Sequence, residues 1–86
     1  MNIKDYSFVL SGNFRKRVFM EFKRKKTPSQ IAKDIKASSS QVSRAIKQLE
    51  ERGLIECLTP DTRMGKVYEL TQKGKAVLAE IENDSN

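Results

Sequence analysis

Apolar side chains recur every three to four residues in the segment after Ser11, which is the spacing of one face of an α-helix. Serine is favoured immediately before a helix, so the pattern predicts a first helix that starts after Ser11. This helix is expected to end near the basic run 23–26, with residues 15–17 turned outward. Its inward positions are Phe14, Val18, Phe19 and Phe22.

The run 6–10 (Tyr-Ser-Phe-Val-Leu), which precedes that helix, is apolar and rich in β-prone residues. It predicts a short strand or an extended lead-in. With 86 residues, the chain is long enough for one compact domain and too short for two. We therefore expect a single domain over 1–86, with its core at about 8–82 and a disordered tail at 83–86.

Two further helices begin at capping sequences. The segment 27–30 (Thr-Pro-Ser-Gln) combines an N-cap, a proline suited to the first helical position and the glutamine of a capping box. The segment 38–41 (Ser-Ser-Ser-Gln) offers a second box and opens a longer helix, for which Gly53 is the expected left-handed terminator. The inward residues are Ile31, Ala32 and Ile35 in the shorter helix, and Val42, Ala45, Ile46 and Leu49 in the longer one.

The apolar spacing changes after Gly53. Segments 54–59 and 66–71 have the composition of two strands, and the turn formers of 60–65 (Pro-Asp-Thr-Arg-Met-Gly) join them into a β-hairpin. Thr71 is then expected to cap a last helix from Gln72 to about Glu82. The predicted fold class is mainly α with a β-hairpin (α+β), in the order helix, helix, helix, hairpin, helix. In the last helix the inward residues are Val77, Leu78 and Ile81, and Gly74 is expected to permit close packing.

The second and third predicted helices are joined by a tight turn at 36–38, which is the arrangement of a helix-turn-helix unit. The face of the third helix that lies opposite its apolar stripe is polar and cationic. A helix that enters the major groove presents its N-terminal residues to base edges. A solvated helix would show a similar face, and the serines are also explained by capping. The expected base-reading residues are Ser39, Ser40, Gln41 and Arg44, and the expected phosphate contacts are Ser43 and Lys47.

The charge balance supports a polyanionic partner. The formal net charge is +6 and the pI is about 9.7, and seven basic residues face one acid between Ser11 and Lys26. This asymmetry indicates one basic face. Lys25, within the basic run 23–26, is expected to contact phosphates, together with Thr27 and Ser29 at the start of the second helix.

The composition also bounds the chemistry. The chain has no histidine, and Cys57 is its one cysteine, so we expect neither a disulfide nor a metal site, and no cofactor. Nothing supplies acid–base or nucleophilic chemistry, which predicts no catalytic residue and no enzyme. Cys57 is expected to be a small core or edge residue, with a thiol sensor as the minority alternative. Without a long apolar run or a signal peptide, the chain is expected to be cytoplasmic and to have no membrane partner.

Segment 32–44 (Ala-Lys-Asp-Ile-Lys-Ala-Ser-Ser-Ser-Gln-Val-Ser-Arg) closely resembles the general prokaryotic helix-turn-helix pattern, although Lys36 stands where that pattern often has glycine. Three further segments resemble the MarR-like winged-helix regulators. They are 49–55 (Leu-Glu-Glu-Arg-Gly-Leu-Ile), 61–63 (Asp-Thr-Arg) and 70–74 (Leu-Thr-Gln-Lys-Gly). Over about 8–81, the chain looks closest to small archaeal regulators of this kind.

The resemblance implies a winged helix-turn-helix fold with the hairpin as the wing. In that family the arginine of Asp-x-Arg at the wing tip reaches the minor groove, which implies this role for Arg63, an orienting role for Asp61 and a phosphate contact for Lys66. A narrow groove concentrates negative potential and attracts arginine. MarR proteins carry extra helices at both ends that form the dimer and the effector cleft. This chain is expected to lack them, and no small-molecule effector site is expected.

The leading hypothesis is therefore a sequence-specific regulator of transcription that binds double-stranded DNA, with the third helix in the major groove and the wing in the minor groove. The two-fold symmetry of operators suggests a homodimer, with 6–10 and the last helix as candidate surfaces. A protein-interaction module in a larger assembly and RNA binding stay open as alternatives. The cationic, hydroxyl-rich third helix disfavours the protein module, because protein interfaces favour exposed apolar and aromatic anchors.

Overall fold

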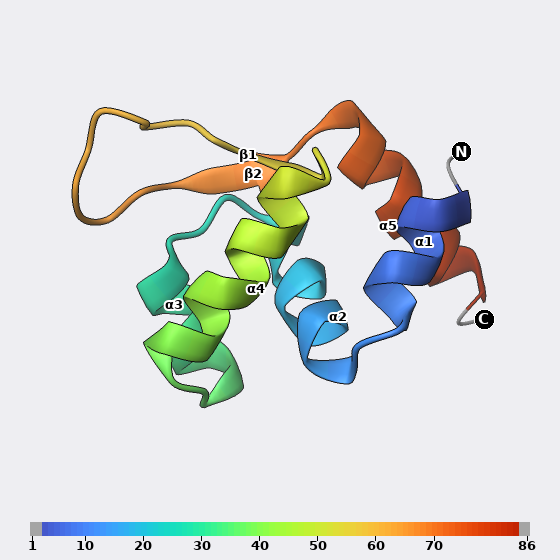
Figure 1. Ribbon diagram of the computed structural model, residues 1–86, viewed down its shortest axis with the longest axis horizontal. Helices are drawn as coiled ribbons and strands as arrows, with labels where there is room; N and C mark the ends of the chain where they lie inside the picture. The colour runs from blue at the N-terminus through green and yellow to red at the C-terminus, as the bar shows by residue number, and fades with distance from the viewer. Residues whose placement is uncertain (1–2, 85–86) are drawn as a thin grey trace.

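The computed structural model describes residues 3–84. This part of the chain contains five α-helices, one short 3-10 helix and a two-stranded antiparallel sheet (Figure 1). The predicted fold class is confirmed, with one additional helix at the start. The elements are α1 (Ile3–Leu10), α2 (Asn13–Met20), η1 (Glu21–Lys23), α3 (Pro28–Ile35), α4 (Ser39–Glu51), β1 (Ile55–Cys57), β2 (Tyr68–Leu70) and α5 (Gln72–Asp84).

The elements form three regions (Figure 1). The helices α2, α3 and α4 pack together, the hairpin extends from them as an arm, and α1 lies against α5 on the opposite side. One hydrophobic core joins them, and the predicted inward positions are buried except Phe14 and Ile35, which are half-buried. The side chains with the least exposure include Val9, Val18, Phe19, Ile31, Val42, Leu49, Leu54, Ile55, Val77 and Ile81.

The prediction of a strand or extended lead-in at 6–10 is wrong, because this segment forms most of α1. Val9 is fully buried in the core, and Tyr6 and Leu10 pack against the core half-buried. Positions 6, 9 and 10 share one face of a helix, so packing of that face overrides the weak β preference of the residues. Asp5 in the first turn also favours a helix, because a carboxylate stabilises the positive end of the helix dipole.

Ser11 does not cap α2, contrary to the prediction. Its backbone N–H donates to the Ser7 carbonyl at 2.9 Å and its hydroxyl donates to the Phe8 carbonyl at 3.0 Å, so it completes the end of α1. Gly12 occupies the N-cap position of α2 without a side-chain hydrogen bond.

The structure differs from the predicted tail at the C-terminal end. The last helix runs through Asp84, so residues 83 and 84 are helical where a disordered tail was expected, and the remainder of that tail lies outside the described residues.

The helix-turn-helix unit forms as its caps predict. The Thr27 hydroxyl accepts from the Gln30 N–H at 3.2 Å, and the Gln30 side chain accepts from the Thr27 N–H at 2.8 Å, which completes a capping box. Ser38 accepts from the Gln41 N–H at 3.2 Å and caps α4, although only this half of the second predicted box forms. Lys36 adopts a left-handed conformation with φ 56° and ψ 49°, so lysine occupies the glycine-type position of the turn.

The hairpin follows a sharp end of α4. Gly53 has φ 73°, its N–H bonds the Glu50 carbonyl, and the Leu54 N–H bonds the Leu49 carbonyl, which is the Schellman pattern of a helix terminus. The two strands are shorter than predicted, and they pair Ile55 with Leu70 and Cys57 with Tyr68.

A third extended segment beside the hairpin was not predicted. Lys26 pairs with Tyr68 in an isolated antiparallel bridge, with two backbone hydrogen bonds of 3.0 and 3.3 Å. This bridge ties the entry to α3 to the base of the wing.

The last helix starts at the predicted cap. The Thr71 hydroxyl accepts from the Gly74 N–H at 3.0 Å. Gly74 is buried against the start of the hairpin, where an added Cβ would lie 2.0 Å from the Leu54 carbonyl oxygen. Only glycine permits this close approach of α5.

Candidate nucleic-acid interface

The most polar surface of the helix-turn-helix unit is one face of α4, which we call the α4 outer face. Val42, Ile46 and Leu49 bury the opposite stripe of the helix in the core. The two cations of the outer face are Arg44 and Lys47, and neither forms an ion pair with a carboxylate within residues 3–84. The outer face consists of Ser39, Ser40, Gln41, Ser43, Arg44 and Lys47, all of them exposed.

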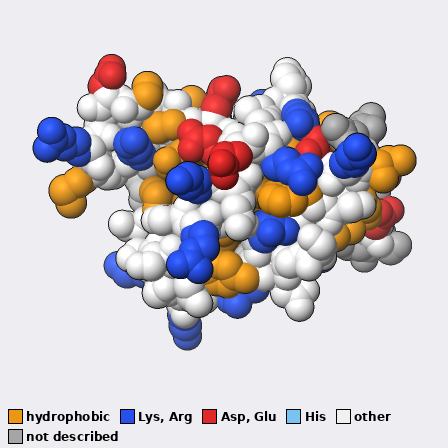
Figure 2. All heavy atoms as spheres, viewed as in Figure 1, with side chains coloured by type: hydrophobic (Ala, Val, Ile, Leu, Met, Phe, Trp, Pro, Cys, Tyr) orange, Lys and Arg blue, Asp and Glu red, His pale blue; other side chains and the backbone are white. Residues whose placement is uncertain are grey.

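The cations and hydroxyls exposed on the α4 outer face suit a polyanionic ligand, but acidic residues follow them at the C-terminal end of α4. Glu50 and Glu51 occupy the last turn of α4 and are exposed. In Figure 2, red side chains gather over this end of α4, with blue side chains towards the rest of α4 and along the wing. The cationic part of α4 is therefore its N-terminal and central part.

The start of α3 borders one edge of this face. A cleft of about 250 Å³ runs between α3, α4 and the base of the wing, and Pro28, Ser43 and Lys47 are among its lining residues. Thr27 is half-buried and Ser29 is exposed at the α3 terminus. The structure thus brings the predicted phosphate contacts of α3 and α4 to a common edge.

Lys25 and Lys26 of the basic run 23–26 differ in their contacts with carboxylates. The Lys26 ammonium lies 2.7 Å from Glu21 Oε1 and 2.8 Å from Asp34 Oδ2, which raises the pKa of Lys26 and lowers the pKa of Asp34. It is a structural contact between η1 and α3. Lys25, by contrast, has a side chain 67% exposed, with Glu69 as a distant partner at 3.9 Å.

The wing presents its predicted residues to solvent. Arg63 is exposed in the loop between the strands, and Lys66 is half-buried nearer to β2. Gly65 has φ 68°, which lets the loop turn back. Among residues 3–84 Asp61 forms no ion pair with Arg63, so the expected orienting contact does not form here.

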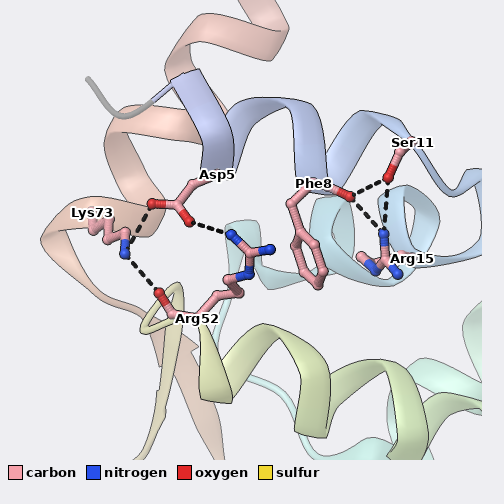
Figure 3. Close-up of polar contacts among 6 residues, drawn as sticks. All are labelled: Asp5, Phe8, Ser11, Arg15, Arg52 and Lys73. Atoms are coloured by element: carbon pink, nitrogen blue, oxygen red, sulfur yellow. Dashed lines mark hydrogen bonds and ion pairs between the residues drawn. The ribbon is translucent and has the colours of Figure 1, made fainter.

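An ionic cluster around the buried Asp5 carboxylate was not predicted (Figure 3). Asp5 of α1 points towards two cations, with Oδ2 2.9 Å from Lys73 Nζ and Oδ1 3.5 Å from Arg52 Nη1. Lys73 also donates to the Arg52 carbonyl at 2.8 Å. The cluster therefore joins α1, the end of α4 and the start of α5.

Arg15 belongs to the same region and does not point outward, contrary to prediction. The Cζ atom of Arg15 lies 3.9 Å from the centre of the Phe8 ring, in a cation–π contact. The Cζ atom of Arg52 lies 4.2 Å from the centre of the same ring. Arg15 Nη1 donates to the Phe8 carbonyl at 2.6 Å, and Nε donates to Gln48 Oε1 at 3.2 Å. Arg15 thus positions α1 and α4 on α2. Figure 3 shows its contacts with Phe8 and Ser11.

Residues 3–83 match the family model described as "Methanogenesis regulatory protein FilR1, N-terminal domain". The chain belongs to the FilR1 N-terminal domain family. No curated protein matches it significantly.

Solved structures of transcriptional regulators, MarR among them, share the fold of this FilR1-type domain. It is 27% identical to the transcriptional regulator SlyA, with a TM-score of 0.76, covering 98% of this chain and 61% of that one. Wild-type MarR from E. coli in its apo form is 21% identical, with a TM-score of 0.73 and coverage of 88% and 59%. A MarR mutant from E. coli complexed with operator DNA is 20% identical, with a TM-score of 0.71 and coverage of 90% and 60%.

The chain spans about three fifths of the length of these solved structures. Their likeness establishes the winged-helix fold, with the hairpin as its wing. Within residues 3–84, no group of three metal-binding side chains was found, and no helix is both long and apolar enough to cross a bilayer.

The two surfaces expected for dimerisation contact each other within the chain. The segment 6–10 lies in α1, which packs on α5, and the Tyr6 hydroxyl donates to Asp84. This hydrogen bond, to a nearby carboxylate, raises the pKa of Tyr6. Ile3 of α1 remains 71% exposed.

Proposed function

We propose that this FilR1-type domain is a sequence-specific regulator of transcription that binds double-stranded DNA with α4 in the major groove. The α4 outer face carries this proposal: it is exposed, cationic and hydroxyl-rich, and it has no competing carboxylate partner among residues 3–84. The MarR mutant complexed with operator DNA, which shares the fold, supports the same class of ligand.

Base reading falls to the first turns of α4. Ser39, Ser40 and Gln41 are exposed next to the N-cap, and Arg44 follows one turn later. Side chains at the start of a helix lying in the major groove reach the base edges, and arginine binds the O6 and N7 atoms of guanine with two hydrogen bonds. Arg44 is accordingly the residue expected to contribute most to base preference.

Phosphate contacts set the register of the domain on the duplex. The expected contacts lie along one edge of α4 and on the segments beside it, and charged and uncharged donors both contribute. A hydroxyl that already accepts a capping hydrogen bond, as in Thr27, still has its own proton to donate to a phosphate. These residues are Lys25, Thr27, Ser29, Ser43, Lys47 and Lys66.

The wing extends the contact into the minor groove through Arg63. Arg63 is exposed in the loop between the two strands and forms no ion pair within residues 3–84. Such a guanidinium suits a narrow groove with strong negative potential. Figure 1 shows the hairpin extending as an arm from the helices. A homodimer on an inverted repeat is the expected assembly, and the exposed end of α1 at Ile3 is its candidate surface.

The test begins with selection of binding sites from a random duplex pool, followed by fluorescence anisotropy of the full chain on the selected duplex. The proposed contacts include five cations, which are Lys25, Arg44, Lys47, Arg63 and Lys66. The logarithm of the binding constant is therefore expected to fall with the logarithm of the salt concentration at a slope of about −4.5. That slope weakens binding about 500-fold between 50 and 200 mM salt. A slope near zero, or equal binding to duplex RNA and single strands, would refute the proposal.

A matched pair of variants separates base reading from phosphate contact. Arg44→Ala is expected to relax preference for one base pair by about 1–3 kcal/mol. Lys25→Ala is expected to weaken all sequences alike, by about eightfold at 0.1 M salt, because one released counterion is lost. Equal loss of specificity in both variants would contradict the assigned roles.

A further inference from the structure

A cleft of about 390 Å³ lies between the start of α2 and α4, on the edge of the α4 outer face away from α3. Asn13, Phe14 and Arg15 line it from α2, and Gln41, Arg44 and Gln48 line it from α4. Spacings of three and four residues put the α4 members on one stripe of the helix. None of the expected phosphate contacts lies in this cleft.

The charge of this cleft is uncompensated. No carboxylate is among its lining residues, whereas the cleft beside α3 includes Glu50 and the cleft beside α5 includes Glu69 and Glu82. Arg15 contacts only neutral groups, namely the Phe8 carbonyl and ring, the Ser11 hydroxyl and the Gln48 amide. With the unpaired Arg44, it places two positive charges at one concave site, which favours an anion.

The position of the cleft identifies the anion. A helix in the major groove, which is about 12 Å wide, has one sugar–phosphate strand along each of its edges. Pro28 and Lys47 line the cleft on the α3 edge, and Thr27 and Ser29 adjoin Pro28 in the chain, so these expected contacts face a single strand. The second strand must then run along the α2 edge, where the cleft opens.

We propose that the cleft between α2 and α4 takes a backbone phosphate of this second strand, bound by Asn13 and Arg15. The Arg44 guanidinium keeps its base-reading role and adds to the positive potential of the cleft. The proposal rests on DNA binding as the proposed function. It gives the domain a contact on each side of the groove, so that α4 is held in register from both strands.

The test places a carboxylate in the cleft without removing a structural contact. Asn13→Asp adds one negative charge at the first position of α2, where an acidic residue stabilises a helix, so the variant is expected to fold at least as stably. Gln48→Glu sets a carboxylate beside Arg15 and neutralises it. Ala79→Glu on the exposed side of α5 makes the same charge change far from the cleft and serves as the control.

Affinity for the selected duplex is measured by anisotropy at several salt concentrations, with thermal unfolding of each variant alongside. Asn13→Asp and Gln48→Glu are each expected to bind about eightfold more weakly at 0.1 M salt and to reduce the steepness of the salt slope by about 0.9. Base preference is expected to stay unchanged, and Ala79→Glu to stay close to wild type.

Binding of Asn13→Asp equal to that of Ala79→Glu overturns the proposal, even if wild type binds DNA as expected. A titration with inorganic phosphate, followed through the backbone amide signals of Phe14 and Arg15, distinguishes the source of the anion. Saturable shifts together with unchanged DNA affinity in Asn13→Asp would assign the cleft to a free anion and overturn the DNA contact. Failure of wild type to bind any duplex would instead refute the proposed function itself, and this inference with it.

Discussion

Replacement of Asp5 by asparagine tests whether the ionic cluster around this buried carboxylate stabilises the domain. Asp5 is 2% exposed, while the side chains of Arg52 and Lys73 are each 43% exposed. The carboxylate attracts Lys73 at 2.9 Å by about 6 kcal/mol and Arg52 at 3.5 Å by about 5 kcal/mol, for an effective dielectric constant of about 20. Burial of the carboxylate offsets several kcal/mol of this attraction.

Breaking a buried ion pair typically costs about 3–5 kcal/mol. Here both cations can turn into water, so the expected loss for Asp5→Asn is lower, about 2–3 kcal/mol of unfolding free energy. For a domain of this size the melting temperature should fall by roughly 10–20 °C. Urea denaturation and thermal unfolding followed by circular dichroism measure both quantities.

A double-mutant cycle with Lys73→Met isolates the ion pair from other effects of each change. The coupling energy between positions 5 and 73 should be at least about 1 kcal/mol. Asp61→Asn, on the exposed wing, is the matched control and should leave stability unchanged. A loss below about 0.5 kcal/mol for Asp5→Asn, or additive effects in the cycle, would refute the reasoning.

Three further substitutions test local features of the fold. Gly74→Ala should destabilise the domain by at least about 2 kcal/mol in urea denaturation, because the added methyl meets the Leu54 carbonyl and the strain exceeds the gain of about 1 kcal/mol in helix propensity. Lys36→Gly should stabilise it by about 0.5–1 kcal/mol, because a left-handed conformation is unfavourable for lysine. Lys26 holds the pKa of Asp34 below its ordinary value of 3.8. The contact between Lys26 and ionised Asp34 therefore contributes to folding stability above pH 4, and this contribution is lost as the pH falls further. Asp34→Asn should therefore flatten the dependence of melting temperature on pH below pH 4.

Each of these variants has a control within the chain. Ala76→Gly, at an exposed position of α5, should lose only about 1 kcal/mol, and equal loss in Gly74→Ala would contradict the close-packing argument. Lys36→Ala should gain little, since alanine shares the left-handed penalty. Asp61→Asn should keep the wild-type dependence of melting temperature on pH. The same dependence in Asp34→Asn would show that Lys26 does not stabilise the Asp34 carboxylate.

The helix-turn-helix unit and the hairpin were predictable from the amino-acid pattern, because their signals act over a few residues. The cap at Thr27 depends on a residue three positions later, and Gly53 ends α4 through hydrogen bonds within five residues. The spacing of apolar residues, which is also a local signal, identified the buried side of α4. The outer face was then predicted as the side opposite to it. The groove assignments of that face stay predictions until binding is measured.

Tertiary structure alone decided the roles of Asp5, Arg15 and Lys26. Asp5 meets Arg52 across 47 positions of sequence, and Arg15 meets Gln48 across 33. No local pattern marks either pair, since a charged residue in isolation has the composition of a solvated surface. Only the packing of α1 on the rest of the domain turns these charges inward, and it made a helix of a segment whose residues favour a strand.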